Sequence, residues 1–240
     1  MNMHHIIITG ASRGIGHATA LLYASMGWNI SICSRHCDYQ MTQTQDAITA
    51  AGGQYFSFCG DMGNAADAEE FLTKAVQTFG TPEILVNNAG ISHIGLLQDM
   101  TPMQWDDIIR TNLSSVFYTS RVIIPYFLQE KHGRIINVSS VWGSVGASTE
   151  VAYSTTKGGI NAFTKALAKE LAPSGIPVNA VACGMIDTSM NSFLDPEELA
   201  AVIDEIPAGT PQEAAALIRQ VAEAPDYMTG QIITLDGGWI

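Results

Sequence analysis

Residues 4–16 read HHIIITGASRGIG, and this stretch decides the fold. Its first half is an apolar run rich in isoleucine, which is typical of a buried strand. Its second half carries Gly10, Gly14 and Gly16, and a helical pattern extends from residue 15 to about residue 26. The order strand, glycine-rich turn, helix places a pyrophosphate on a helix N-terminus. The three glycines permit, in turn, the tight bend, the approach of backbone to phosphate, and close packing of helix on strand.

Downstream of this stretch, strand-like runs alternate with helical ones. The alternation predicts right-handed βαβ crossovers and a parallel sheet that is covered on both faces. The predicted strands cover residues 4–9, 28–33, 54–59, 83–87, 133–139, 176–182 and 231–235. The predicted helices cover residues 15–26, 39–51, 64–79, 102–129, 151–171, 196–204 and 211–223. No linker, repeat or low-complexity stretch divides residues 1–240, so we expect a single α/β domain.

A second group of residues carries potential chemistry. Tyr153 and Lys157 are four residues apart in a predicted helix, so their side chains share one face. A free tyrosine has a pKa of ~10, and we expect the lysine cation to lower it enough for proton exchange. Ser140, at the end of a predicted strand, is placed to hold a carbonyl oxygen. This chemistry reduces a ketone or oxidises an alcohol.

The chain resembles the short-chain dehydrogenases/reductases over nearly all of its 240 residues. The motifs that carry the resemblance are Thr9-Gly10-x-x-x-Gly14-x-Gly16, Asn87-Asn88-Ala89-Gly90, Asn112, Ser140, Tyr153-x-x-x-Lys157, Thr229-Gly230-Gln231 and Asp236-Gly237-Gly238. The resemblance implies a single doubly wound Rossmann domain with seven parallel strands in the order 3-2-1-4-5-6-7. It also implies a catalytic tetrad of Asn112, Ser140, Tyr153 and Lys157.

The same resemblance implies a nicotinamide cofactor. Its predicted contacts are Gly10, Ser12, Arg13, Gly14, Ile15, Gly16, Ser34, Arg35, Asp61, Met62, Asn88, Ala89, Gly90, Tyr153, Lys157, Gly184, Ile186 and Thr188. The second predicted strand ends in Ser34-Arg35, at the place where an acidic residue would select NAD. Arg35, together with Arg13 in the glycine loop, favours NADPH over NADH because guanidinium–phosphate contacts are strong. The alternative is that Arg35 points into solvent.

Two substrates fit the resemblance. The chain as a whole is similar to 3-oxoacyl-[acyl-carrier-protein] reductases, which act on β-ketoacyl thioesters in fatty-acid synthesis. Residues 140–153, with Trp142 and Glu150, are also similar to reductases that act on a 5-aminopentanone group attached to a lysine of elongation factor P. A carboxylate at Glu150 would attract an amine, but a carboxylate is favourable at any helix start, so both substrates stay open. Met185 and Phe193 are further candidates for substrate contact.

Charge and composition set limits on the partners. The formal net charge of −12 argues against nucleic acid, and it matches an acidic carrier protein poorly. Lys131 and Arg134 are the basic residues left for docking a carrier protein. No apolar run approaches the ~20 residues of a membrane span, and nothing before the first strand resembles a signal peptide, so we expect a cytoplasmic protein.

The four cysteines show no metal-site spacing, so we expect no metal and interpret them as buried or incidental thiols. Cys183 occupies a position where the family usually has proline. We place a substrate lid near residues 188–210, with a loop at 207–211 that is shorter than is usual in the family. Both the lid and Cys183 are expected to influence the shape of the pocket.

Family members are commonly dimers or tetramers, so we expect a homo-oligomer, with a homotetramer as one candidate. The helices at 102–129 and 151–171 are the expected contact surfaces, although an apolar stripe on the second helix is equally compatible with the core. A catalytically quiet NADP(H)-binding scaffold is a remote alternative, because the fold alone does not establish catalysis.

Overall fold

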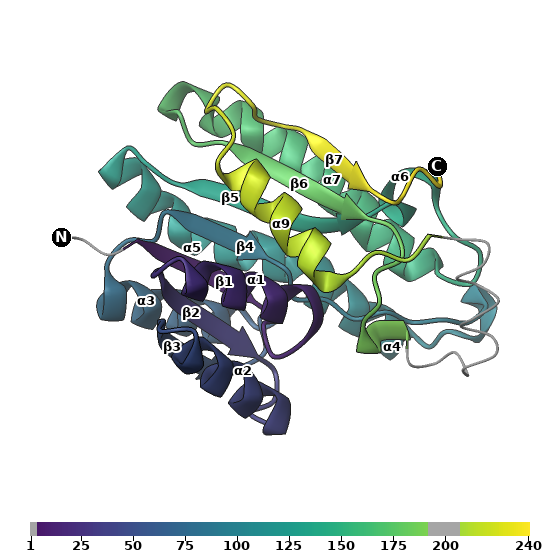
Figure 1. Ribbon diagram of the computed structural model, residues 1–240. Coiled ribbons are helices and arrows are strands. Elements are labelled where there is room, and N and C mark those ends of the chain that lie inside the picture. Colours follow the sequence, from purple (N-terminus) through teal and green to yellow (C-terminus); the bar gives the residue numbers. More distant parts are fainter. Residues whose placement is uncertain (1–3, 192–206) are drawn as a thin grey trace.

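The computed structural model describes residues 4–191 and 207–240. A seven-stranded sheet with the order β3-β2-β1-β4-β5-β6-β7 forms its centre, and every pairing is parallel (Figure 1). The strands are β1 (His5–Thr9), β2 (Asn29–Ser34), β3 (Gln54–Cys59), β4 (Ile84–Asn87), β5 (Arg134–Ser140), β6 (Val178–Cys183) and β7 (Ile232–Leu235). The predicted fold class and strand order are therefore confirmed.

Helices connect the strands. They are α1 (Gly14–Ser25), α2 (Tyr39–Ala50), α3 (Ala65–Phe79), α4 (Pro102–Ile109), α5 (Ser115–Glu130), α6 (Trp142–Val145), α7 (Val151–Leu171) and α9 (Pro211–Ala222). Short 3₁₀ turns are η1 (Leu97–Asp99), η3 (Ala172–Ser174) and η4 (Ser189–Asn191). The helix predicted at 196–204 lies outside the described residues. None of the helices in the described part of the chain is long and apolar enough to cross a membrane.

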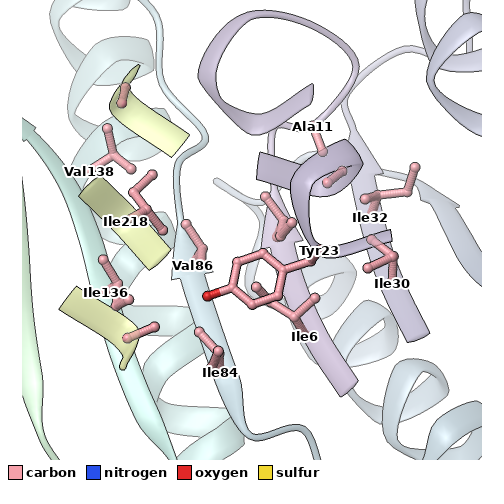
Figure 2. Close-up of a cluster of buried hydrophobic side chains, with 14 of the residues drawn as sticks. Ile6, Ala11, Tyr23, Ile30, Ile32, Ile84, Val86, Ile136, Val138 and Ile218 are labelled. Atoms are coloured by element: carbon pink, nitrogen blue, oxygen red, sulfur yellow. The ribbon is translucent and has the colours of Figure 1, made fainter. Parts of the chain in front are cut away.

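Two helical layers bury the two faces of the sheet. Helices α1, α2 and α9 pack on one face, and α3, α5 and α7 pack on the other (Figure 1). In β1, Ile6 and Ile8 face the first layer while Ile7 faces the second, as the alternation of side chains along a strand requires. Figure 2 shows the first core, in which Tyr23 of α1 lies among the isoleucines and valines of the central strands. An uninterrupted apolar run such as residues 6–8 therefore marks a strand that is buried on both faces.

The apolar stripe of α7 belongs mainly to the core. Ile160, Leu167 and Leu171 are all buried, and the last two join the cluster formed with α3 and α5. Phe163 is partly buried against the same cluster. Of the two interpretations that the sequence left open for this stripe, the structure supports core packing.

The predicted helix 102–129 is not continuous. A π-helical turn, η2 (Arg110–Ser114), separates α4 from α5. Asn112 lies in this turn, and its side chain is hydrogen-bonded to the backbone of Ile91 in the segment after β4. A π turn inserts a residue into the helical spacing and is common at functional sites. Hydrophobic periodicity does not reveal it, because the apolar residues of both flanking helices still repeat with a helical period.

The interpretation of all four cysteines as unpaired thiols is wrong for two of them. Cys37 and Cys59 are exposed and form a disulfide with their Cα atoms 5.7 Å apart. Parallel pairing of β2 with β3 places Ser34 opposite Cys59, so the turn after β2 brings Cys37 to the end of β3. Cys33 and Cys183 are buried free thiols, as expected.

Candidate active site

The glycine-rich turn follows β1 at the edge of the sheet where all the parallel strands end. Gly10 has φ of +65°, and a Cβ at this position would lie 2.7 Å from the Cα of Ala89. A Cβ on Gly16 would lie 2.5 Å from Nδ2 of Asn88, and this amide donates to the carbonyl oxygens of Thr9 and Gly10 at 3.0 and 2.8 Å. Side chains at these glycines would therefore separate β1, α1 and the segment after β4.

A cavity of about 790 Å³ lies along this edge. It gathers most of the predicted site, namely Gly10, Ser12, Arg13, Gly14, Ile15, Ser34, Arg35, Asp61, Met62, Asn88, Ala89, Gly90, Ser140, Trp142, Glu150, Tyr153, Lys157, Gly184, Met185, Ile186 and Thr188. Of the predicted residues that the structure describes, Gly16 and Asn112 do not line it. Phe193, and residues 192–206 of the lid predicted near 188–210, lie outside the described residues.

The shape and donors of the cavity fit a dinucleotide. Its volume lies within the ~300–1,000 Å³ typical of small-molecule and cofactor sites. The first N–H groups of α1 have no carbonyl within the helix to bind, which makes them donors for phosphate. Arg13 occupies the N-cap position, and its guanidinium group has no acceptor with which it could occupy these donors. The cavity also lies beside the switch point between β1 and β4, where ligands of such sheets bind.

The two arginines expected to select NADPH both line the cavity, but they do not converge on one spot. Arg13 donates to a glutamine side chain of α2 at 3.1 Å. Arg35 donates to the hydroxyl group of Thr111, and its Nη2 lies 3.5 Å from Asp61 and 3.7 Å from Asp107. Arg35 is thus tethered at the cavity wall and does not extend freely into solvent. Its carboxylate partners come from two separate elements, which the sequence did not reveal.

The side chains predicted to be catalytic come mainly from β5 and α7. Ser140 is the last residue of β5, and its hydroxyl group is hydrogen-bonded to that of Tyr153. The Nζ of Lys157 lies 5.4 Å from the centroid of the Tyr153 ring and donates to the carbonyl oxygen of Val138 at 2.8 Å. The neighbouring Ser139 donates instead to an asparagine of α7 at 2.7 Å. Of the two serines, Ser140 is therefore the one that meets the tyrosine.

The pKa of Tyr153 shifts in the direction opposite to our expectation. Burial raises this pKa, the charges at Glu150 and Cys183 raise it further, and the hydrogen bond from Ser140 lowers it. The expected lowering by Lys157 is not found, because the loss of water around the phenolate is the largest cause of the shift. Tyr153 is consequently a neutral phenol at neutral pH. This is the form that donates a proton, as the reduction of a ketone requires.

Burial also lowers the pKa of Lys157 to about 8, with the charge on Cys183 opposing the shift. The protonated lysine is the form that stabilises the developing phenolate, and it is lost as the pH rises through that value. We therefore expect kcat/KM for ketone reduction to be level below about pH 8 and to fall above it, approaching a tenfold loss per pH unit. A pH–rate profile measures this. Lys157→Arg keeps its positive charge to high pH, so the fall in kcat/KM above about pH 8 should be absent from its profile. A wild-type profile that stays level to high pH would contradict the assignment.

Asn112 is buried next to the cavity and does not line it. Its side chain is fully buried, accepts from the N–H of Ile91 at 2.8 Å and donates to the carbonyl oxygen of the same residue at 2.8 Å. It also donates to the hydroxyl group of Thr156 at 3.2 Å. Gly90, between β4 and this contact, lies next to both Asn112 and Lys157. Asn112 therefore fixes the segment after β4 against the catalytic helix.

Glu150 lines the cavity and is the N-cap residue of α7. Its carboxylate accepts hydrogen bonds from the hydroxyl group of Ser92 at 3.0 Å and from the side chain of Trp142. Burial raises the pKa of Glu150, and these two hydrogen bonds lower it. Thr149, just before it, has φ of 62°, a strained conformation for a β-branched residue. The chain thus holds one carboxylate in a defined position near Tyr153.

Several residues of the site escaped the sequence reasoning. Trp239 lines the cavity and packs edge-to-face on Trp142, with ring centroids 4.9 Å apart. Ser92 and His93 also line it, from the irregular segment after β4. The signal available in the sequence was the position of Ser92 just after Asn88-Ala89-Gly90. For Trp239 the sequence held no local signal, because the contact joins residues nearly a hundred positions apart.

Comparison with known proteins agrees with this geometry. The sequence model of the short chain dehydrogenase family matches residues 4–199 of this chain. A 3-oxoacyl-[acyl-carrier-protein] reductase of Synechocystis sp. is 37% identical over 98% of this chain and 96% of its own. The reductase FabG of Staphylococcus aureus, also a 3-oxoacyl-[acyl-carrier-protein] reductase by name, is 36% identical over 97% and 96%. An uncharacterized oxidoreductase of Bacillus subtilis, YmfI, is 35% identical over 97% of both chains.

The chain belongs to the short-chain dehydrogenases/reductases. It is an NAD(P)-dependent oxidoreductase of that family, and it is similar over almost its whole length to reductases named for 3-oxoacyl groups carried on acyl-carrier protein.

Proposed function

We propose that the protein reduces a ketone with NADPH. The observation that carries this proposal is the hydrogen-bonded pair Ser140 and Tyr153, with Lys157 one helical turn further along the same face. Arg13 and Arg35 at the cavity wall support a cofactor with a 2′-phosphate. A homo-oligomer, either dimer or tetramer, is part of the proposal, and the exposed Phe117 and Leu128 on α5 support it.

The residues divide the chemistry among them. Bound NADPH would supply a hydride to the carbonyl carbon. Ser140 and Tyr153 hold the carbonyl oxygen between their hydroxyl groups, and Tyr153 gives that oxygen its proton. Lys157 stabilises the phenolate left behind, and Asn112 holds the segment after β4 against the helix that carries Tyr153 and Lys157. Positioned proton transfer of this kind is worth ~10²–10⁴ in rate.

A 3-oxoacyl thioester on acyl-carrier protein is the first candidate substrate, and the names of the relatives support it. The structure gives less support for docking the carrier. Arg134 begins β5 while Ser140 ends it, which separates them by roughly 20 Å along the strand. Arg134 is also bound to Asp226 at 2.6 Å and to a backbone carbonyl at 2.7 Å. It is therefore not a basic residue that flanks the site.

A 5-aminopentanone group on modified elongation factor P is the second candidate substrate. Glu150 is the specific observation in its favour, because its carboxylate lines the same cavity as Tyr153. A cationic amine would form a charge-assisted hydrogen bond with it, whereas a neutral acyl thioester has no group to match it. The amine and the ketone of such a substrate would then contact Glu150 and Tyr153, respectively.

A parallel assay of NADPH oxidation with both substrates tests the proposal. Turnover of the 3-oxoacyl thioester alone would identify an acyl-carrier-protein reductase. Turnover of the modified elongation factor alone would identify an enzyme of translation-factor maturation. Tight NADPH binding with no turnover of either substrate would contradict the proposal and favour the quiet NADP(H)-binding scaffold.

Glu150→Gln separates the two substrates by charge while keeping an acceptor for Ser92. If the substrate carries an amine, we expect kcat/KM to fall about tenfold or more, because a hydrogen bond between two charged groups becomes one in which only the ammonium group is charged. For a neutral thioester we expect a change of less than about twofold, since the carboxylate makes no charged contact with it. Steady-state kinetics with both substrates measure the difference. Glu170→Gln, at the other end of α7, is the matched control, and equal losses for both substrates would refute the amine contact.

A further inference from the structure

The disulfide between Cys37 and Cys59 borders the candidate nucleotide site. Cys37 lies between His36 and Asp38, which both line the cavity. Asp61, also in the lining, follows two residues after Cys59. Both cysteines are exposed at the surface. An exposed pair with a Cα separation of 5.7 Å is within the range of a disulfide and open to reagents in solution.

The cross-link acts on the short loop that follows β2. One end of this loop is held by Ser34, whose carbonyl oxygen accepts from the N–H of Gly60 at 3.0 Å. The other end is held by Asp38, which caps α2 by accepting from the N–H of Met41 at 3.2 Å. The disulfide adds a third attachment at Cys37, in the middle of the loop. It thereby joins the segment that carries Arg35 to the end of β3.

The position of Arg35 depends on the same two segments. Its guanidinium group lies 3.5 Å from the carboxylate of Asp61, which follows β3, while its backbone belongs to the loop after β2. The backbone of the loop after β2 is joined to the end of β3 before Arg35, by the hydrogen bond between Ser34 and Gly60, and after Arg35, by the disulfide at Cys37. These two attachments constrain the distance between the segments that carry Arg35 and Asp61. When the bond is reduced, the loop gains conformational freedom that it must lose again to bind a ligand.

We propose that Cys37 and Cys59 form a reversible redox pair, and that their oxidation raises the affinity of the adjoining site for the 2′-phosphate of NADPH. The inference rests on the proposed function as an NADPH-dependent reductase. Its physical basis is that a loop held in place before binding loses less entropy when the cofactor binds. NADH lacks the 2′-phosphate, so its affinity depends much less on this loop.

The redox step is a thiol–disulfide exchange with a small disulfide of the glutathione class. The thiolate of one cysteine attacks a sulfur of the reagent, forming a mixed disulfide and releasing one thiol. The thiolate of the second cysteine then attacks the protein sulfur of that mixed disulfide and releases the second thiol. The two cysteines lose two electrons, the reagent gains them, and the two protein protons pass to the released thiols. A dithiol reverses both steps.

The two remaining cysteines provide an internal control. Cys33 and Cys183 are buried, so the reagent reaches them only slowly. Cys183 lines the cavity, and its modification would also change cofactor binding. The double variant Cys37→Ser, Cys59→Ser retains both buried thiols and separates their effect from that of the proposed pair.

The test compares the full chain after treatment with dithiothreitol and after treatment with oxidised glutathione. Mass spectrometry of non-reduced peptides follows the bond between Cys37 and Cys59, and fluorescence titration gives Kd for NADPH and for NADH. We expect oxidation to tighten NADPH binding about two- to tenfold and to change NADH binding by less than about twofold. The double variant should bind both nucleotides equally under the two treatments.

Three outcomes would overturn the proposal. The first is that the bond does not form with oxidised glutathione. The second is that it forms but NADPH binds with the same Kd, while catalysis with NADPH persists, in which case only the redox proposal fails. The third is that the double variant responds as the wild type does, which assigns the effect to the buried thiols Cys33 and Cys183, since both line the cavity. If NADPH binds to neither form, the proposed function fails as well, and the binding curves show this directly.

Discussion

Tyr153→Phe is expected to lower kcat for ketone reduction by about 10²–10⁴, because it removes the group that donates the proton. The ring remains, so its packing in the buried site and its contact with Lys157 should be kept. Only the hydroxyl group and its hydrogen bond to Ser140 are lost. We therefore expect Kd for NADPH to change by less than about twofold, because the hydroxyl group that is removed is the one proposed to contact the substrate oxygen. Stopped-flow or steady-state NADPH oxidation measures kcat, and fluorescence titration measures Kd.

The matched control for this variant is Tyr55→Phe, which removes a phenol from the partly exposed Tyr55 of β3, outside the cavity lining. Its activity should equal that of the wild type. If Tyr153→Phe kept more than about a tenth of the wild-type kcat, a positioned proton transfer from this residue would be excluded, because the loss would fall below the range that such a step contributes.

Under the proposed function, Arg35→Ala is expected to weaken NADPH binding by about 10- to 100-fold while leaving NADH binding nearly unchanged, because the variant could not form the proposed charge-assisted hydrogen bond to the 2′-phosphate. The structure adds a second reason. Asp61 and Asp107 both lie within 4 Å of this guanidinium group, and Asp61 lines the cavity, so removal of the guanidinium leaves the Asp61 carboxylate at the cavity wall without this cation. Titration of the variant with NADPH and with NADH gives both values of Kd.

Arg121→Ala on the exposed surface of α5 controls for the change in net charge, because this residue lies outside the cavity lining. It should bind both nucleotides as the wild type does. Equal losses for NADPH and NADH in Arg35→Ala would show that Arg35 supports the wall of the site without contacting a 2′-phosphate.

Local patterns in the sequence were enough to predict most of the fold. The glycine-rich turn after residues 4–9 follows directly from residue types and their spacing, since only glycine tolerates φ of +65° at Gly10 with Ala89 so close. The predicted strands start and end within two residues of the observed strands. The same holds for the predicted helices other than 102–129, which is interrupted, and 196–204, which lies outside the described residues. Tyr153 and Lys157 likewise share a helix face because they are four residues apart. Such features depend on neighbours in the chain.

Other features were decided by tertiary packing alone. The π turn at Asn112 exists where its side chain meets Ile91, twenty-one residues away. The bond between Cys37 and Cys59 depends on the pairing of β2 with β3. The raised pKa of Tyr153 reflects burial by several distant segments, and this burial reversed the effect expected from Lys157. The sequence by itself thus determined the elements and the strand order through the family it indicates, and it predicts the residues of the tetrad. Only the tertiary structure decided their electrostatics and their distant partners, because desolvation and contact are properties of the packed chain.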